Sequence, residues 1–594
     1  MALIATSVSG FAVEADSWIR INQLGYLPGS VKVAVFLSSK GKEAPAFTVR
    51  NAKNNKVVFS GKGQAANASR WGMEDALRLN FSAVSDTGRY YIECNGAKSP
   101  VFRINGNVYD GTADFLLKYM RQQRCGYNPY LDTLCHQHDG YIVDHPTREG
   151  EKLDVRGGWH DASDYLQYLP TSANATFQML FAWQQTPDKT IFLDKYGADG
   201  KLGANGVPDI VDEIRWGLEW MVQMNPDSTL MFNQIADDRD HASMRIPTTD
   251  KVDYGYGPGL GRPVYPVTGK PQGLRQHKNR STGVSSSAAK YASAFSLGSE
   301  IFREIDPEFS AVLQQKAAPA YRYGKKYPGN NQTACTVSPY FYEEDNWVDD
   351  MELAAAVEYN LTGNPGWRKE ADYWGQLEEV TPWMELGRAR HYQFYPFVNL
   401  GHFYLAKSND EKISAKYQDY MKQGLECLSK RAADFGDPFL FGVPFAWCSN
   451  NLVAAAITQA RLYNQATGDD SYMEMEAALR DWLFGCNPWG TSMICGLPDD
   501  GDSPTRPHSF VVEIMDDIPY GGLVDGPIDR ARYESLLGIH LKYDDPYAPF
   551  QNGAAVYHDD PGDYSSNEPT MDGTASLSFY LSTMQKLGQN EKKK

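Results

Sequence analysis

The hydrophobic pattern of the chain changes its period near residue 105, and this change limits the possible folds more than any other feature. Before it, apolar residues alternate with period two, as in Val31, Val33 and Val35, which is typical of β-strands with one buried face. After it, apolar residues recur at helical spacing, as in Ile210 and Ile214. The sequence therefore predicts an all-β domain followed by a larger helical domain.

The two predicted domains differ in size and in the length of their loops. Residues 16–106 show about seven strand-like runs, which fit a small β-sandwich of immunoglobulin-like type. Residues 107–590 hold about twelve amphipathic segments, beginning near residues 110, 170, 208, 284, 310, 348, 367, 395, 411, 448, 470 and 573. Pairs of helices in this number predict an (α/α)6 barrel. Loops 233–283 and 486–569 are too long to be simple connections, so we expect the chemistry there.

Charge and composition exclude several classes of partner. The formal net charge is −17 and the predicted pI about 5.2, which disfavours nucleic acid and anionic membranes. The chain has 13 Trp and 36 Tyr, whose flat faces suit sugar rings as well as a large aromatic core. We expect a monomer with a carbohydrate ligand, without nucleic-acid binding or membrane insertion, and without an organic cofactor.

The first fifteen residues have the character of an export signal. Residues 1–15 are rich in apolar and small residues, and they offer a small-x-small cleavage site. They lack a basic beginning, so we interpret them as the remnant of a signal peptide and exclude them from the fold. The sequence thus predicts a secreted or periplasmic protein exported as in bacteria.

Residues 157–164, GGWHDASD, place two carboxylates three positions apart beside paired glycines. If this segment is a loop that enters a helix near residue 165, Asp161 and Asp164 can converge on one point. Like charges at short distance raise each other's pKa unless an ordered group, such as a water molecule, lies between them. The competing interpretation is that either Asp caps the N-terminus of the helix.

A second acidic segment, HDDPGDYSSNE at residues 558–568, also precedes a helical pattern. A glycosidase needs one protonated carboxyl group to donate to the leaving oxygen and one carboxylate to activate water. The two segments can supply this pair, although a solvated acidic loop is the alternative. The neighbours Asp559, Asp560 and Asp563 can keep Glu568 protonated by like-charge repulsion.

These segments resemble the signature boxes of glycoside hydrolase family 9. The family carries GGWxDAGD early in its catalytic domain and DY..NE near its end, and this chain has GGWHDASD and DYSSNE. The run WIRINQLGY at residues 18–26 is similar to the start of the immunoglobulin-like module that precedes many of these domains. Further matches are NGVPDIVDE at residues 205–213, Ser281-Thr282, Asp349-Asp350 and GCNP at residues 485–488. The resemblance covers nearly the whole chain.

The resemblance implies an enzyme that cuts β-1,4-linked polysaccharides or oligosaccharides with inversion. Asp164 would be the general base, Asp161 would help to hold the attacking water, and Glu568 would be the general acid. Direct attack by water requires roughly 6.5–9.5 Å between acid and base. The implied activity is that of a cellulase-like endo-β-1,4-glucanase.

Two metal sites are expected. Cys125, Cys135, His136 and His160 offer two thiolates and two imidazoles, which suit a structural zinc ion, and some relatives with the leading module carry a similar set. His138, Asp139 and His145 are competing ligands, and unliganded thiols are the alternative. Carboxylates in loop 194–213 suit calcium, and the resemblance favours Asp209, Asp212 and Glu213, which can otherwise be first-turn residues of a helix.

Substrate contacts are expected from polar and aromatic side chains of the long loops. The candidates are His508, Trp347, Trp383, Trp447, Trp489 and Tyr564. Each of these aromatic residues is individually as well explained by a place in the core. As a group, they are expected to line a cleft.

The chain departs from the family at two places near the site. The usual His-His-Arg triplet is replaced by His508-Ser509-Phe510, and the usual Asp-Tyr pair by Asp572-Gly573. Both changes affect substrate contacts and leave the acid and base intact. They leave open a xyloglucan-active endoglucanase and an exo-acting glucosaminidase or cellodextrinase. A glycan-binding protein without turnover is the alternative from another class, and it does not explain why all three carboxylates are kept.

Overall fold

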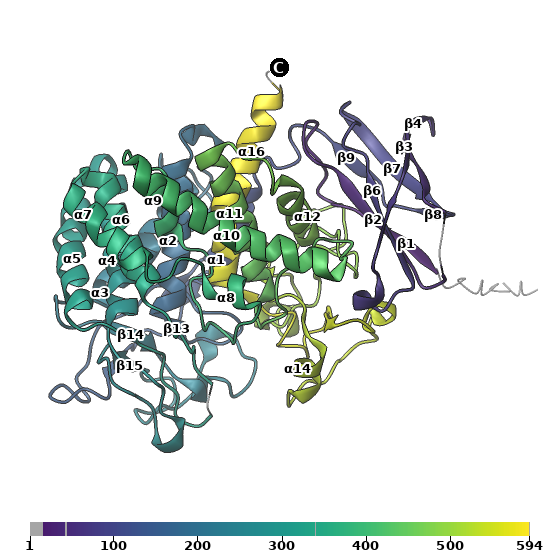
Figure 1. Ribbon diagram of the computed structural model, residues 1–594. Helices are drawn as coiled ribbons and strands as arrows, with labels where there is room; N and C mark the ends of the chain where they lie inside the picture. The colour runs from purple at the N-terminus through teal and green to yellow at the C-terminus, as the bar shows by residue number, and fades with distance from the viewer. Residues whose placement is uncertain (1–15, 42–43, 339, 593–594) are drawn as a thin grey trace, which may run out of the picture.

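The computed structural model describes residues 16–41, 44–338 and 340–592. The predicted signal remnant, residues 1–15, lies outside the described residues. The chain forms a β-sandwich packed against a larger helical domain, which confirms the predicted fold class (Figure 1). Among the described residues, no helix is both long enough and apolar enough to cross a membrane.

The sandwich consists of two antiparallel sheets. One has the order β1-β2-β6-β5, and the other has the order β4-β3-β7-β8 with β9 also on β7. The strands are β1 (Ser17–Arg20), β2 (Val33–Ser38), β3 (Ala46–Asn51), β4 (Val57–Lys62), β5 (Gln64–Ala66), β6 (Asp75–Asn80), β7 (Gly88–Cys94), β8 (Ala97–Lys98) and β9 (Phe102–Ile104).

Strand β2 has both of its faces buried, and they belong to different cores. Ala34 and Phe36 lie in the core of the sandwich, whereas Val35 and Leu37 join the core of the helical domain. The period-two alternation therefore separates two cores, because successive strand side chains point to opposite faces. The outward face of this sheet is the interface between the domains.

Buried polar contacts also cross this interface. The Asn22 side chain donates to Asp481 at 2.7 Å, and the Gln23 amide donates to the carbonyl of Gly490 at 2.7 Å. Gln23 thus holds the start of loop 486–569. The sandwich supports a loop that carries site residues, in addition to packing against the helices.

The helical domain contains paired helices of very different length. They are α1 (Thr112–Gln122), α2 (Leu169–Gln185), α3 (Asp209–Gln223), α4 (Ser285–Ile305), α5 (Pro307–Lys326), α6 (Val348–Thr362), α7 (Pro365–Gly375), α8 (Pro382–Leu386), α9 (Leu400–Ala406), α10 (Glu411–Phe435), α11 (Ser449–Thr467), α12 (Met473–Leu483), α13 (Phe510–Glu513), α14 (Arg530–Ser535), α15 (Met571–Ser576) and α16 (Ser578–Lys592).

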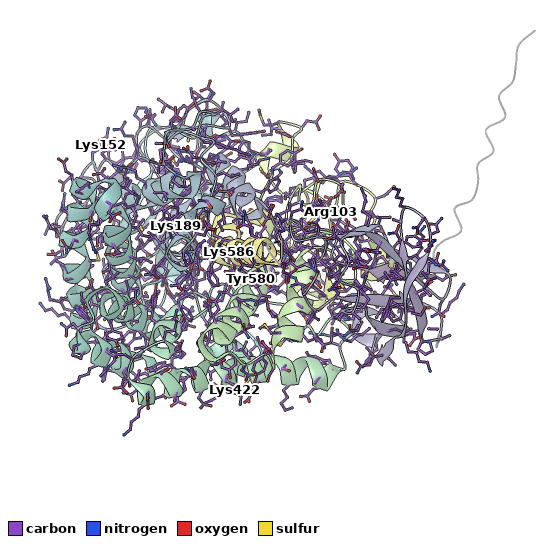
Figure 2. All side chains as sticks on the ribbon, turned by 90° about the horizontal axis from the view of Figure 1, so that it is seen from above. Arg103, Lys152, Lys189, Lys422, Tyr580 and Lys586 are labelled. Atoms are coloured by element: carbon purple, nitrogen blue, oxygen red, sulfur yellow. The ribbon has the colours of Figure 1, made fainter. Side chains whose placement is uncertain are left out.

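An inner set of helices follows a closed path of neighbours. Helix α2 packs on α4, α4 on α6, α6 on α9, α9 on α11, α11 on α15, and α15 returns to α2. Outer helices such as α3, α5, α7, α10 and α12 pack against this set. Viewed from above, α16 runs end-on near the middle of the molecule, with the sandwich to one side (Figure 2).

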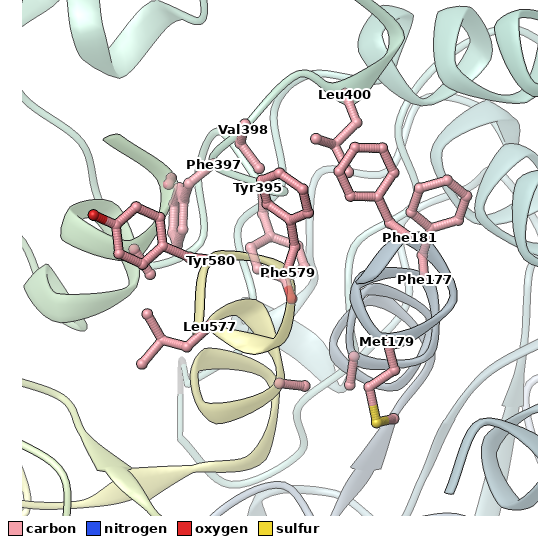
Figure 3. Close-up of a cluster of buried hydrophobic side chains, with 14 of the residues drawn as sticks. Phe177, Met179, Phe181, Tyr395, Phe397, Val398, Leu400, Leu577, Phe579 and Tyr580 are labelled. Carbon is pink, nitrogen blue, oxygen red and sulfur yellow. The ribbon is translucent and has the colours of Figure 1, made fainter. Parts of the chain in front are cut away.

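The apolar centre of the helical domain joins helices that are far apart in sequence. Phe181 of α2 faces Phe579 of α16, with the two rings 5.1 Å apart, and Phe177 stacks on Phe181 at 6.5 Å (Figure 3). Phe181 also contacts Phe403 of α9 at 5.8 Å. Buried aromatic pairs of this kind stabilise a core beyond their area alone, so they fix α2 relative to the C-terminal helices.

The loops at one end of the helices carry a small sheet that supports the first acidic segment. Its order is β12 (Tyr141–Ile142), β15 (Pro263–Pro266), β14 (Phe232–Ile235) and β13 (Gln167–Tyr168). Strands β13, β14 and β15 lie in the lower left part of the view, below the helices (Figure 1). Because β13 immediately follows residues 157–166, the sheet anchors this segment at the mouth of the helical domain.

Candidate active site

The segment GGWHDASD forms a tight loop, and neither of its Asp residues caps a helix. Gly158 has φ 69°, a conformation that L side chains rarely adopt, and a Cβ there would lie 2.7 Å from the ring of Trp220. Helix α2 begins four residues after Tyr165 with Tyr168 as N-cap and no side-chain capping bond. The capping interpretation of Asp161 and Asp164 is therefore wrong, and both carboxylates are available for other roles.

Asp161 is buried among hydroxyl donors. It is 3 % exposed, and its carboxyl oxygens accept from Thr171 Oγ1 at 2.7 Å and from the hydroxyl of Tyr342. Burial, reinforced by the charges of Asp164 and Asp572, raises the pKa of Asp161 well above its usual value. A protonated Asp161 would not add a second negative charge beside that of a neighbouring carboxylate.

Asp164 is partly exposed and faces a cation. Its Oδ1 accepts from the backbone of Leu166 at 3.0 Å, and its Oδ2 lies 3.4 Å from His241 Nε2. Burial lowers the pKa of His241, but the hydrogen bond and charge of Asp164, with Asp240 and Glu568, outweigh it and raise the pKa to about 9. The imidazolium therefore stabilises the ionised form of Asp164, which is the form that a general base needs.

Glu568 reaches the same loop from the other end of the chain. Its Oε1 accepts from the backbone N–H of Ser163 at 3.0 Å and also from the Ser163 hydroxyl. Burial raises the pKa of Glu568, the charge of Asp164 acts in the same direction, and His508 and Ser163 oppose them. The three predicted catalytic carboxylates are thus brought together, with Asp164 and Glu568 both partly exposed.

The remaining acidic residues of the second segment have structural partners. Asp559 accepts from the backbone of Thr505 and Arg506 at 2.9 Å, and Asp560 accepts from the backbone of Lys542. The principal influences on the Glu568 pKa are burial, His508 and Asp164, and these neighbours are not among them. We expected Asp559, Asp560 and Asp563 to keep Glu568 protonated. In the structure, the pKa of Glu568 is raised instead by burial and by the charge of Asp164.

Three of the predicted substrate residues form a wall beside Glu568. The rings of Trp447 and Tyr564 are stacked with centroids 5.8 Å apart, and His508 lies 6.2 Å from Tyr564. Trp447 Nε1 donates to Asp525 at 3.1 Å, and both Trp447 and Tyr564 are half-buried. Stacked, partly exposed aromatic rings of this kind suit the apolar face of a sugar.

Two predicted substrate residues belong to the core, which corrects the sequence interpretation. Trp383 is 0 % exposed and donates to the carbonyl of Phe397, and Trp489 is 2 % exposed and donates to Gln551. Neither ring can stack on a sugar. Trp347 is half-buried at the start of α6 and packs on Trp374 at 5.5 Å, which leaves its contact with substrate a prediction.

The predicted zinc ligands form one compact group. The ligand atoms of Cys125, Cys135, His136 and His160 all lie within 4.8 Å of one another. His136 Nδ1 is 3.2 Å from His160 Nε2 and 3.7 Å from Cys125 Sγ, and Cys135 Sγ is 3.9 Å from His160 Nε2. Zinc bonds of about 2.0–2.3 Å in a tetrahedron place ligand atoms about 3.3–3.8 Å apart. The donor set and its spacing therefore fit a metal ion.

The calcium candidates each have protein partners. Glu213 forms a buried ion pair with Arg124 at 2.6 Å, and Asp212 accepts from the Asn205 amide at 2.9 Å. Asp209 accepts from the backbone of Lys195 at 2.8 Å. Within the described parts of the chain, the Cys/His group is the one such cluster found, and calcium at these carboxylates stays a prediction.

Four functional residues escaped the sequence interpretation. Tyr342 binds Asp161, His241 binds Asp164, and Asp572 accepts from the hydroxyls of Tyr392 and Tyr395 at 2.8–3.0 Å. Asp525 is fully buried beside Glu568, whose backbone carbonyl accepts the Asp525 N–H at 2.8 Å. The acidic residues between Asp237 and Asp240 could have pointed to His241 as a site residue. A lone Tyr such as Tyr342 gives no such signal in the sequence.

Gly573, which replaces the family's usual Tyr, has no room for a side chain. A Cβ at this position would lie 2.1 Å from Asn451 Oδ1. Beside this position, the buried rings of Tyr342 and Tyr392 stack at 4.2 Å, and their hydroxyls donate to Asp161 and Asp572, respectively. The buried aromatic pair therefore connects these two carboxyl groups.

Comparisons with known proteins identify the family of the chain. The model of glycosyl hydrolase family 9 matches residues 109–581, and the model of the cellulase N-terminal ig-like domain matches residues 14–99. A xyloglucan-specific endo-β-1,4-glucanase of Bacteroides ovatus is 26% identical over 98% of this chain and 96% of its own length.

Solved structures of similar proteins have the same architecture. A metagenome-derived family 9 endoglucanase has a TM-score of 0.74 and 25% identity over 96% of this chain and 99% of its own. A Zn-binding triple mutant of another family 9 endoglucanase has a TM-score of 0.72 at 22% identity, covering 94% and 99%, and it supports the fold alone. The family model spans most of the chain and both acidic segments, so this protein belongs to glycosyl hydrolase family 9 and is a glycoside hydrolase.

Proposed function

We propose that the protein is an inverting endo-β-1,4-glucanase that hydrolyses cellulosic or related β-glucans. The observation that carries the proposal is the meeting of Asp161, Asp164 and Glu568 at one loop, with Ser163 in contact with the acid. An ionised carboxylate beside an imidazolium and a buried carboxyl group with a raised pKa are the two protonation states that hydrolysis by inversion requires.

In this mechanism one water molecule is consumed and one glycosidic bond breaks. Asp164 accepts a proton from water as the water oxygen bonds to the anomeric carbon. The bond between that carbon and the leaving oxygen breaks, and Glu568 donates its proton to this oxygen. Asp161, fixed by Thr171 and Tyr342, helps to orient the water. The configuration at the anomeric carbon is inverted because attack and departure occur on opposite faces.

The test is the anomeric configuration and the size of the products. Soluble cellulose derivatives, mixed-linkage glucan, xyloglucan and chitosan are incubated with the enzyme, and the first product is followed by proton NMR. We expect an α-anomer as the first product and a rapid fall in viscosity, since an endo enzyme cuts within chains. A β-anomer would contradict inversion, and release of single sugar units without loss of viscosity would contradict endo action.

Xyloglucan is the second candidate substrate. It is supported by the similarity to a xyloglucan-specific endo-β-1,4-glucanase over nearly the full length of both chains. A higher kcat/KM on xyloglucan than on unbranched glucans would establish it. Exo action on glucosamine oligomers or cellodextrins is the remaining enzymatic alternative, and the chitosan and cello-oligosaccharide digests distinguish it.

A glycan-binding protein without turnover is the alternative from another class. It predicts that the wild type and a Glu568→Gln variant bind oligosaccharides equally and that neither releases product. Measurable turnover in the wild type and its loss in the variant exclude this alternative.

We also propose that the Cys125–Cys135–His136–His160 group binds zinc in a structural role. Its two thiol and two imidazole donors suit tetrahedral zinc, and the site lies beside the box because His160 immediately precedes Asp161. Zinc would supply a fixed crosslink between residues 125–136 and the catalytic loop. Metal analysis of the purified protein tests this role, with one zinc per chain expected.

Export to the cell exterior or the periplasm, as a monomer, completes the proposal. It is supported by the signal-like residues 1–15 and by the class of substrate, because a polysaccharide is degraded where the polymer is found. N-terminal sequencing of the exported protein tests the cleavage, and light scattering tests the monomer.

A further inference from the structure

A row of alternating charges joins the Cys/His group to the catalytic base. The first link is Asp250, whose Oδ2 lies 3.2 Å from His136 Nε2, the ring nitrogen that faces away from the cluster. His160 Nδ1 has no hydrogen-bond partner among the described residues. Asp250 is therefore the carboxylate that orients a cluster histidine, a role that commonly tunes metal affinity.

The second link is Arg245, which bridges two carboxylates. Its guanidinium lies 2.8 Å (Nε–Oδ1) and 3.2 Å (Nη2–Oδ2) from Asp250. The same Nη2 lies 2.8 Å from Asp240 Oδ2. Asp240 and Asp250 are both largely buried, and Arg245 is mostly so. A planar guanidinium held by two buried carboxylates is restrained on both sides, so Arg245 connects Asp250 directly to Asp240.

The third link is Asp240, which reaches the catalytic loop. Its Oδ1 accepts the backbone N–H of Tyr165 at 2.8 Å, and Tyr165 directly follows Asp164. The residue after Asp240 is His241, which pairs with Asp164 itself. Asp240 therefore controls both the backbone next to the base and the cation that faces it.

Tyr165 is the point where the cluster and the row of charges meet. Its ring lies 5.5 Å from that of His136 and 4.8 Å from that of His160. The Arg245 guanidinium lies 4.7 Å from the same ring, and the Tyr165 hydroxyl donates to the backbone carbonyl of Arg245. Tyr165 is thus in contact with both cluster histidines and with Arg245, and it directly follows Asp164 in the chain.

We propose that Asp250, Arg245 and Asp240 form a relay that couples the geometry of the metal cluster to the position of the catalytic base Asp164. The inference rests on the proposed roles of Asp164 and of the Cys/His group. It assigns Arg245 and Asp240 as positioning residues, because neither contacts the reacting atoms. The relay makes the cluster more than a local crosslink, since it acts on both the backbone and the cation of the base.

The test measures zinc binding and kinetics in the same variants. The relay predicts that Arg245→Met weakens zinc binding and lowers kcat by about 10- to 100-fold each, with little change in KM. Zinc affinity is measured by titrating Zn²⁺ alone into the metal-free protein against a competing chelator. Asp240→Asn gives the sharpest result: it is expected to weaken zinc binding although Asp240 bonds to no cluster residue.

The matched control is Arg215→Met. Arg215 also bridges two carboxylates, Glu219 at 2.7 Å and Asp306 at 2.8 Å, but it lies on α3 away from the relay. We expect unchanged zinc affinity and kcat. Arg245→Lys keeps the charge without the two-sided fork, so it is expected to recover part of both properties, and it replaces Arg245→Met if that variant does not fold.

Two results would overturn the relay. One is a change in only one of the two properties in the Arg245 and Asp240 variants, either a lower kcat with unchanged zinc affinity or a weaker zinc affinity with unchanged kcat. The other is a kcat and a zinc affinity that both stay within twofold of the wild-type values. Failure of the proposed function gives a different result. In that case the wild type would be inactive, or Asp164→Asn would be as active as the wild type. The zinc titrations would still show whether the Arg245 and Asp240 variants change the zinc affinity.

Discussion

The two acidic segments of the active site are held in different ways. In the first, Asp161 and Asp164 are fixed by Tyr342 and His241, which come from distant loops. In the second, Asp563 accepts from the Ser565 hydroxyl and from the Ser566 hydroxyl at 2.7 Å, and the backbone of other loops adds contacts such as the Asp525 N–H to the Glu568 carbonyl at 2.8 Å. The carboxylates of the base loop are thus fixed by distant side chains, whereas the turn before Glu568 is fixed by its own hydroxyl groups and by the backbone of other loops.

The two carboxylates therefore have different electrostatic surroundings. Asp164 receives a cation, His241, from a neighbouring loop. Glu568 is partly exposed, but protein atoms enclose much of its carboxyl group, and this burial raises its pKa. The role of each carboxylate is therefore decided by what surrounds it, which is the general way in which paired acids and bases are separated.

The largest expected effect separates acid from base. Asp164→Asn and Glu568→Gln should each lower kcat by about 10²- to 10⁴-fold on a polysaccharide. On an aryl glycoside whose leaving group needs no protonation, Glu568→Gln should recover most of its activity and Asp164→Asn should not. Kinetics on both substrates measure this, with Asp499→Asn, an exposed loop carboxylate, as the control. Equal recovery in both variants would contradict the assignment.

The second prediction concerns the cation beside the base. His241→Gln should lower kcat by about 10-fold or more, since a hydrogen bond between charged groups is lost. Because the pKa of His241 is raised to about 9, the ring is charged at neutral pH. The loss of kcat relative to the wild type should therefore be largest below about pH 9, where the wild-type ring is charged, and should become smaller as the ring loses its proton above this pH. A loss of kcat that does not depend on pH would show that the charge of His241 does not act on the base.

The third prediction concerns the contact between the two segments. Ser163→Ala should lower kcat a few-fold, because the backbone N–H of residue 163 still donates to Glu568 after the hydroxyl is lost. The hydrogen bond from the Ser163 hydroxyl lowers the pKa of Glu568, so the loss of this hydrogen bond raises the pKa. The acid then keeps its proton to higher pH, and the basic limb should move upwards. A downward shift would contradict the assignment of this limb to Glu568.

The smallest effect is expected within the local turn of the acid loop. Ser565→Ala removes one hydrogen bond to Asp563, which should lower the free energy of unfolding by about 1 kcal/mol. Other contacts of Asp563, from His558 and Ser566, remain, so kcat should stay within about twofold. Thermal unfolding and steady-state kinetics check this. A large loss of kcat at unchanged Tm would show that the turn has a direct catalytic role.

The fold was predictable where local signals agree with tertiary packing. The segment beginning near residue 310 corresponds to α5, which starts at Pro307 after the N-cap Asp306, whose side chain accepts from Phe309 at 3.0 Å. Such a cap followed by Pro is readable in the sequence. The catalytic carboxylates and the Cys/His group were also predictable, because each is part of a distinctive set of residue types.

The partners of those residues were not predictable, because they depend on how the loops meet. Nothing near Tyr342 indicates that its hydroxyl reaches Asp161. Trp383 and Trp489 illustrate the opposite error: their positions in aromatic loops predicted exposure, but both lie in the core. A single large aromatic residue carries no periodicity, so its burial cannot be inferred from the sequence alone.

The position of Ser163 between Asp161 and Asp164 has a consequence for how this segment can vary. One short peptide carries three groups in a fixed order: Asp161, which helps to hold the water, then Ser163, which contacts the acid Glu568, and then the base Asp164. Adding or removing a single residue would rotate the later groups away from their partners. Substitutions at the flanking positions can be tolerated, but the number of residues from Asp161 to Asp164 has to stay the same.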